Sequence, residues 1–138
     1  QFYYDTIVYR DIIKRREIRS VQKMESMINF FLQNISNLTA YSNVASMVSL
    51  STDSVVEYVG FLQNAYFIFN IPLFSYSVKQ QEVNPKKIYC VDTGIRNVKG
   101  FRFSDDFGRL YENIVFTEIK RRYANNPLCR VLYWRNKE

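Results

Sequence analysis

The sequence predicts an α+β fold, because its hydrophobic periodicity changes twice along the chain. Apolar residues recur at three- and four-residue intervals in stretches of residues 21–66, follow a strand pattern over residues 67–79 and 87–91, and return to helical intervals over residues 107–123. The 138 residues are 47% hydrophobic and include 11 tyrosines, 11 phenylalanines and one tryptophan. This apolar content suffices for a packed core and excludes a disordered chain.

The first half of the chain predicts four helices. Short helices are expected at residues 9–16, with a basic end, and at residues 43–48. Between them one amphipathic helix is indicated by Val21, Met24, Ile28, Phe31, Leu32 and Ile35. Serine and threonine oxygens at residues 49–53 can accept hydrogen bonds from free backbone N–H groups, so a fourth helix is expected at residues 52–66.

A long hairpin is expected next. Alternation predicts a strand from residue 67 to residue 79, which Pro72 bends or breaks. Residues 80–85 predict a turn, residues 87–91 predict a returning strand, and residues 92–94 close the hairpin. This order of helices followed by a hairpin is that of a winged helix.

The last third of the chain predicts one helix and one strand. A basic connector contains Arg96, Lys99 and Arg102. The helix at residues 107–123 has an apolar stripe made of Phe107, Leu110, Tyr111, Ile114, Val115 and Ile119. It ends at the sequence Asn125-Asn126-Pro127, and residues 130–135 predict the strand.

Charge is distributed unevenly along the sequence. The net charge is +3 over residues 1–23, −3 over residues 24–78, which contain no Lys or Arg, and +6 over residues 79–138. The expected recognition helix at residues 52–66 carries Asp53 and Glu57 and no cation, so DNA phosphates would repel it. We therefore expect this winged helix to pack between domains rather than to read DNA through that helix.

The sequence indicates a cytoplasmic chain without membrane contact. Cys90 and Cys129 lie in apolar runs and are too few for a disulfide framework, which favours buried thiols in a reducing compartment. No signal peptide pattern opens the sequence, and the uncharged stretch at residues 26–52 is too polar to span a bilayer. Because it starts without Met and stops abruptly after a strand, we expect the chain to be a piece of a larger protein.

Three segments resemble the signatures of a known family. Residues 84–94 (NPKKIYCVDTG) resemble the pattern PKxYxxDTG, residues 107–119 (FGRLYENIVFTEI) resemble GxLxENxVxxEL, and residues 133–135 (YWR) resemble the strand that follows. In this order they resemble the C-terminal half of prokaryotic AAA-type ATPases. Members of that family carry a nucleotide-binding module, a winged helix and a domain of unknown function similar to restriction endonucleases.

The resemblance implies three parts. Residues 1–20 would be a linker or helix from a preceding ATPase module, residues 21–94 a winged-helix domain, and residues 95–138 the truncated start of an endonuclease-like α/β domain, with its first helix and strand. ATP and Mg²⁺ would belong to the parent protein. No cofactor is expected in this chain, because its four glycines are isolated and form no phosphate loop.

Glu112 and Glu118 are the candidate catalytic residues. The resemblance implies that Glu112 is the helix carboxylate that joins two strand acids around Mg²⁺, although the sequence ends before the expected Asp. The alternative for Glu112 is a bond to the local backbone or an interaction with the helix dipole. Glu118 falls within the apolar stripe and would need a partner such as Arg122, or would join Glu112 at a metal or phosphate site.

Basic side chains of the wing and the last helix are candidates for contacts with nucleic-acid phosphates. They are Lys79, Lys86, Lys87, Lys120, Arg121 and Arg122. A solvated face without a ligand is the alternative interpretation.

The leading hypothesis is a non-catalytic regulatory or docking region of an AAA-type ATPase, with its own upstream ATPase module as partner and with DNA association through the basic wing and last helix. One alternative is half of a metal-dependent nuclease-like domain that uses Glu112. The other is a winged-helix regulator that binds DNA. Oligomerisation is left open by the sequence.

Overall fold

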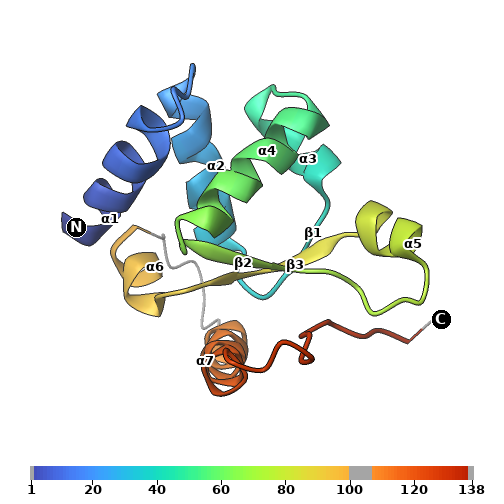
Figure 1. The fold of residues 1–138 in the computed structure, drawn as a ribbon. Helices are drawn as coiled ribbons and strands as arrows, with labels where there is room; N and C mark the ends of the chain where they lie inside the picture. Colours follow the sequence, from blue (N-terminus) through green and yellow to red (C-terminus); the bar gives the residue numbers. More distant parts are fainter. Residues whose placement is uncertain (1, 100–106, 137–138) are drawn as a thin grey trace.

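The computed structural model describes residues 2–99 and 107–136 and arranges them in three layers (Figure 1). Most of the helices cover one face of a small sheet, and a long helix, α7, lies against the other face. The predicted α+β class is confirmed. The elements are α1 (Phe2–Asp5), the π-helical η1 (Thr6–Lys14), α2 (Val21–Gln33), β1 (Leu38–Thr39), α3 (Tyr41–Val48), α4 (Thr52–Asn64), β2 (Ile68–Ile71), α5 (Val78–Val83), β3 (Lys86–Cys90), α6 (Thr93–Lys99) and α7 (Phe107–Arg122).

The sheet is antiparallel, and its strand order is β1-β3-β2. The central strand β3 pairs with β1 through Leu38 and Lys87, and with β2 along its length from Ile71 opposite Lys87 to Ile68 opposite Cys90. Alternate side chains of a strand point to opposite faces. β3 therefore contributes side chains both to the helical layer and to the face that carries α7.

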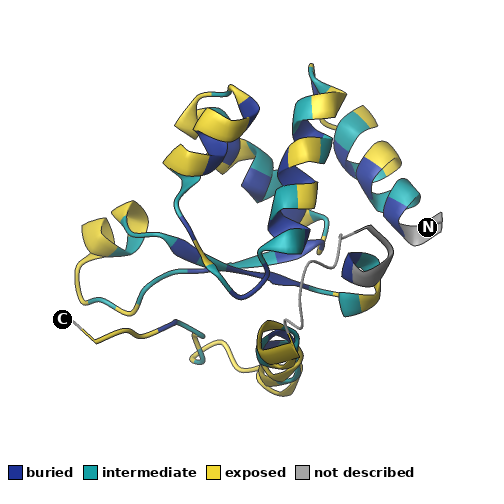
Figure 2. Cartoon of the chain, turned by 180° about the vertical axis from the view of Figure 1, so that it is seen from behind, coloured by how far each residue is buried: buried dark blue, intermediate teal, exposed yellow. Residues whose placement is uncertain are grey.

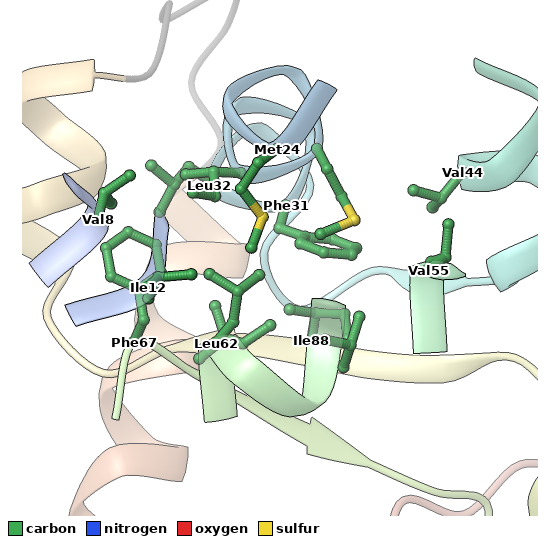
Figure 3. Packing of buried hydrophobic residues seen from close by; sticks show 14 of the residues in the cluster. Val8, Ile12, Met24, Phe31, Leu32, Val44, Val55, Leu62, Phe67 and Ile88 are labelled. Atoms are coloured by element: carbon green, nitrogen blue, oxygen red, sulfur yellow. The ribbon is translucent and has the colours of Figure 1, made fainter. Parts of the chain in front are cut away.

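The main core lies between the helices and the sheet. Figure 3 shows Phe31 and Leu32 of α2 meeting Leu62 of α4 and Ile88 of β3. The predicted apolar face of α2 is buried apart from its first residue, Val21. On α4, Val55, Val59 and Leu62 are buried as predicted, whereas Val56 and Tyr66, which were expected on the same face, are exposed. Tyr66 lies beyond the end of α4 with a φ of 52°, so the chain has already left the helix there.

The predicted capping of α4 is confirmed. The Ser51 hydroxyl accepts a hydrogen bond from the backbone N–H of Ser54 at 3.1 Å, and satisfies one of the free donors of the first turn. α3 ends in the left-handed conformation at Ser49, with a φ of 53°, and the Leu50 N–H returns to the Ala45 carbonyl. These local bonds end α3 and begin α4, so the two helices are separate although only a short turn lies between them.

The hairpin differs from the prediction. β2 ends at Ile71, and residues 74–78 form no strand; instead the expected turn contains α5, whose first turn is capped by the Ser77 hydroxyl. Pro72 lacks an N–H, so it interrupts the ladder, and the alternation beyond it finds no partner strand. Residues 93–99, expected as a connector with Arg96 and Lys99, form α6, while Arg102 lies outside the described residues.

The strand predicted at residues 130–135 is also absent. Tyr133 forms only an isolated parallel bridge with Leu73. Two backbone bonds hold it: the Phe74 N–H donates to the Tyr133 carbonyl at 2.7 Å, and the Tyr133 N–H donates to the Pro72 carbonyl at 3.1 Å. The C-terminal segment thus lies beside the chain that leaves β2 without extending the sheet.

The buried face of α7 is not the one predicted. Asn113 and Phe116 face the sheet, and Leu110 packs at the margin of the main core. The rest of the predicted stripe is exposed, namely Phe107, Tyr111, Ile114, Val115 and Ile119. Figure 2 shows exposed residues over most of the surface of α7. This other face packs on the sheet because the sheet presents aromatic rings and unpaired backbone groups of β3. Phe116 stacks on the rings, and Asn113 forms hydrogen bonds with the backbone groups.

Across residues 2–99 and 107–136, no helix has both the length and the apolar character needed to cross a membrane.

Candidate functional site

The predicted acid Glu112 lies where α7 crosses β3. Its carboxylate accepts hydrogen bonds from the Lys87 ammonium at 2.8 Å and from the Tyr89 hydroxyl at 2.7 Å. Burial, followed by the bond to this carboxylate, raises the pKa of Tyr89 above its usual value. Tyr89 therefore stays protonated and remains a donor to Glu112 over the ordinary pH range.

Asn113, the next residue of α7, replaces a missing strand. Beyond Lys87 the β1 side of β3 has no partner strand, because β1 contains only two residues. The buried Asn113 amide accepts from the Cys90 N–H at 2.8 Å and donates to the Cys90 carbonyl at 2.9 Å. This side chain thus supplies the two bonds that a paired strand would give.

A small aromatic core lies under the same crossing. The Phe116 ring stacks on Tyr89, with centroids 4.0 Å apart and planes 11° apart, and meets Phe69 of β2 edge to face at 5.4 Å. Lys120 places its ammonium over the Phe69 ring at 5.5 Å. We call the set Lys87, Tyr89, Cys90, Glu112, Asn113 and Phe116 the β3–α7 junction.

The C-terminal segment is fastened beside this junction. The Tyr133 hydroxyl donates to the Pro85 carbonyl at 2.6 Å, and the Arg135 guanidinium donates to the Asn84 side chain at 2.8 Å. All three segments that carry the family resemblance are therefore in contact. Residues 84–94 contact residues 107–119 through the junction and residues 133–135 through these two bonds.

An open pocket of about 540 Å³ borders Glu112. Its wall includes Asn34, Ser36, Lys87 and Arg109, so it is polar and carries charges of both signs. The Ser36 hydroxyl donates to the Arg109 carbonyl at 3.0 Å and joins the loop after α2 to the first turn of α7. Within residues 2–99 and 107–136, no group of three or more His, Cys, Asp or Glu side chains could hold a metal ion.

Glu118 is not buried in an apolar stripe as its helical position predicted. Its side chain is 39% exposed and accepts bonds from Arg121, at 2.8 Å, and Arg122, at 2.7 Å. The bonds from these two arginines lower the pKa of Glu118 to about 2. The predicted pairing with Arg122 is confirmed, and Arg121 adds a second partner. Glu118 is six positions from Glu112, so the two carboxylates point from different sides of α7.

The candidate phosphate contacts are in different environments. Lys86 is buried, and its ammonium donates to the carbonyls of Gln81, Glu82 and Asn84, at 2.8 Å for Glu82 and 3.2 Å for Asn84, which closes the end of α5. Burial lowers the pKa of Lys86. Lys87, Lys120, Arg121 and Arg122 have the partners described above, and Lys79 is exposed on α5. A phosphate contact through any of them stays a prediction.

Sequence reasoning missed the residues that hold the junction together. The sequence does not single out Asn113, because a polar residue inside a helix is usually solvated, and the partners of Glu112 are 25 and 23 positions away in sequence. One signal was available: the resemblance pattern pairs the Glu with an Asn, and both residues prove to bond β3.

The family of the chain follows from its sequence. A family model described as a domain of unknown function, DUF8612, matches residues 1–104. The chain belongs to the DUF8612 family. The matched region contains Lys87, Tyr89 and Cys90 of the junction, while Glu112 and Asn113 follow it.

The DUF8612 chain also resembles parts of two longer proteins. An uncharacterized protein of Methanocaldococcus jannaschii is 30% identical over 125 residues, which cover 87% of this chain and 27% of that protein. An uncharacterized protein of Haemophilus influenzae is 26% identical over 124 residues, which cover 86% of this chain and 31% of that protein. The chain thus spans about a third or less of the length of these relatives. No solved structure matches it.

Proposed function

We propose that the chain is a docking module of an AAA-type ATPase, in which a winged helix is joined to the first elements of an endonuclease-like domain. The order α2, β1, α3, α4, β2, α5, β3, with β1 on the outer side of β3 and α5 within the hairpin connection, supports a winged helix over residues 21–94. The three ordered signatures support the ATPase family and the endonuclease-like start at residue 95. ATP and Mg²⁺ would bind the upstream module, which would be the partner of this chain.

The β3–α7 junction is the observation that carries a docking role. Its polar groups form hydrogen bonds with one another: Glu112 with Lys87 and Tyr89, and Asn113 with the Cys90 backbone. Residues that bond two units to each other fix their relative orientation. We therefore assign these signature residues to coupling between the winged helix and the following domain rather than to chemistry.

The surface of α4 supports protein contacts over base reading. Asp53, Val56 and Glu57 are exposed on this helix, and it contains no cation. An acidic helix is repelled by DNA phosphates, whereas an exposed valine between two acids suits a basic protein surface. The basic segment before α2 contacts α4 in this way within the chain, since the Arg16 guanidinium lies over the Phe61 ring at 5.0 Å.

Titration with ATP and Mg²⁺ tests the assignment of nucleotide binding to the upstream module. Isothermal titration of this chain should show no submillimolar binding, and such binding would overturn the proposal. Where an ATPase module precedes the chain, the Glu112→Gln, Asn113→Ala double variant should change ATP hydrolysis, because it loosens the junction. The Asn125→Ala variant, at an exposed position in the turn after α7, serves as the control.

Duplex DNA binding separates this proposal from a winged-helix regulator. We expect weak, strongly salt-dependent binding that falls on substitution of Lys79 or Lys120 and is unaffected by changes at residues 52–58. Loss of sequence-specific binding on Thr52→Ala would favour the regulator instead.

A metal-dependent nuclease half-site is the second candidate. Glu112 is 42% exposed at its side chain and borders the open pocket, so a domain completed by further sequence could bring other acids to it. A chain extended beyond residue 138 should then cleave plasmid DNA with Mg²⁺ or Mn²⁺, and Glu112→Ala should abolish cleavage. Cleavage that survives this substitution would exclude Glu112 as a metal ligand.

A further inference from the structure

Three aromatic side chains are exposed together at the end of the hairpin. Phe74 is 45% exposed, Tyr76 is 96% exposed and Trp134 is 68% exposed. Phe74 and Tyr76 belong to the segment between β2 and α5, and Trp134 belongs to the C-terminal segment, which runs toward α5 (Figure 1). Large rings normally bury much of their area, so a cluster of exposed rings marks a contact surface.

A pocket of about 370 Å³ lies between these two segments. Its walls include Phe74, Gln80, Asn84, Trp134 and Arg135. The bonds of Arg135 to Asn84, at 2.8 Å, and of the Phe74 N–H to the Tyr133 carbonyl, at 2.7 Å, hold the walls together. Phe74 also fixes Tyr76 by an edge-to-face contact at 5.4 Å. We call this pocket, together with Tyr76, the wing pocket.

The two segments that form the wing pocket carry a net positive charge. These segments, residues 72–84 and 130–136, carry Lys79, Arg130 and Arg135 against a single acid, Glu82. Lys79 is exposed on α5, one position from Gln80 of the pocket wall. Ring faces for stacking and an amide for hydrogen bonds therefore meet in the wing pocket, with Arg135 in its wall and Lys79 next to it in sequence as cations for phosphates.

We infer that the wing pocket binds unstacked nucleobases of a single-stranded nucleic acid. Bases present flat faces that stack on aromatic rings, and each base brings a phosphate that the cations attract. In a duplex the base faces are stacked on one another, so this pocket has nothing to stack on. An apolar peptide would give the cations no opposite charge and the amide no additional hydrogen-bond partner. The inference goes beyond the proposed docking role, since it gives the hairpin end a ligand of its own.

The chain contains a built-in probe for this site. Trp134 is its only tryptophan, so intrinsic tryptophan emission reports on the wing pocket alone. We expect oligo(dT) and oligo(rU) of about ten nucleotides, the length of one single-strand binding module, to quench this emission with saturation. Comparison of the two oligomers decides whether DNA or RNA is preferred. A duplex of the same length should bind at least about tenfold more weakly.

Substitution at Tyr76 tests the stacking itself. Tyr76→Ala should weaken binding by about five- to 150-fold, the range for loss of one stacked base, while Tyr76→Phe should retain it because the ring remains. The high exposure of Tyr76 means that neither change disturbs the core, which circular dichroism verifies. Tyr111→Ala, at an exposed tyrosine of α7, is the matched control and should have no effect.

Salt dependence tests the cations. Lys79→Ala should lower the slope of log affinity against log salt by roughly 0.7, the value for one lost phosphate contact on a single strand. Three results would overturn the inference: no quenching by either oligomer, equal affinity for the duplex, or equal affinity of the Tyr76→Ala variant. Emission that changes with protein concentration but not with oligonucleotide would also overturn it, because the wing pocket would then be a contact between copies of the chain.

Discussion

At the scale of single residues, we expect Asn113 to contribute strongly to stability. Substitution by Ala leaves the N–H and the carbonyl of Cys90 unpaired in a buried site. Each of the two unsatisfied groups costs about 1–3 kcal/mol, so we expect Asn113→Ala to lower the free energy of unfolding by about 2–6 kcal/mol. Urea denaturation measures this change.

The control for Asn113 is Asn125, an exposed asparagine in the turn after α7. Asn125→Ala should change the free energy of unfolding by less than about 0.5 kcal/mol. A loss below about 1 kcal/mol in Asn113→Ala would mean that water or another group replaces the amide.

The two cysteines should differ in reactivity. Burial raises the pKa of the Cys90 thiol from 9.0 to about 11, and its thiol donates to the Asp92 carbonyl, whereas Cys129 is partly exposed. A thiolate is the reactive form, so at pH 8 a two-unit rise makes its fraction roughly 100-fold smaller. We expect iodoacetamide to label one thiol in the folded chain, and the Cys129→Ser variant to be labelled only after unfolding. Fast labelling of that variant would contradict the buried position of Cys90.

The same shift has a defined sign in folding stability. Between pH 9 and pH 11 the unfolded Cys90 thiol ionises while the folded one stays neutral. Its contribution to stability is therefore complete below pH 9 and is lost as the pH rises toward 11.

At the scale of elements, neighbouring residues of α7 should respond in opposite ways. Phe116 is 5% exposed and stacks on Tyr89, while Val115 is 58% exposed. Phe116→Ala should cost about 3–5 kcal/mol of unfolding free energy, and Val115→Lys less than about 0.5 kcal/mol. Thermal unfolding of the two variants measures the contrast. A large loss in Val115→Lys alone would show that the predicted stripe is the buried face after all.

The limits of α7 could be predicted from sequence, but its orientation could not. Periodicity places the apolar residues on one side of the helix. The side that is buried, however, is the one whose side chains match the groups on the facing surface of the sheet. Here the sheet offers the unpaired backbone of Cys90 and the ring of Tyr89, which a polar Asn113 and a single Phe116 satisfy. The orientation of α7 therefore depends on residues more than 20 positions away in sequence, as the bond between Tyr89 and Glu112 illustrates.

In the hairpin, too, the local sequence pattern alone does not determine the structure. Alternation of Phe74, Tyr76 and Val78 is the pattern of a half-buried strand, but a strand also needs a partner. The returning strand β3 begins only at Lys86 and pairs with residues 68–71. Residues beyond Pro72 therefore form a loop and α5, and their rings remain exposed at the wing pocket.

At the scale of the whole molecule, β3 joins two cores. Ile88 and Cys90 belong to the large cluster under the helices, and Tyr89 belongs to the small cluster under α7. The order of helices and strands that builds the large cluster could be predicted from local periodicity. The small cluster could not, because it is assembled from Ile71, Phe116 and Tyr133, which are far apart in sequence.

The shared strand predicts that both cores unfold together. Loss of β3 would expose Ile88 and Tyr89 at once, so neither cluster is expected to persist without the other. Leu32→Ala in α2, at a residue of the large cluster that does not belong to the small one, should cost about 2–5 kcal/mol. It should shift the urea midpoints of helical circular dichroism and of Trp134 emission by the same amount. Two separate midpoints would instead mean that α7 and the C-terminal segment detach first, and that the β3–α7 junction is too weak to transmit orientation between domains.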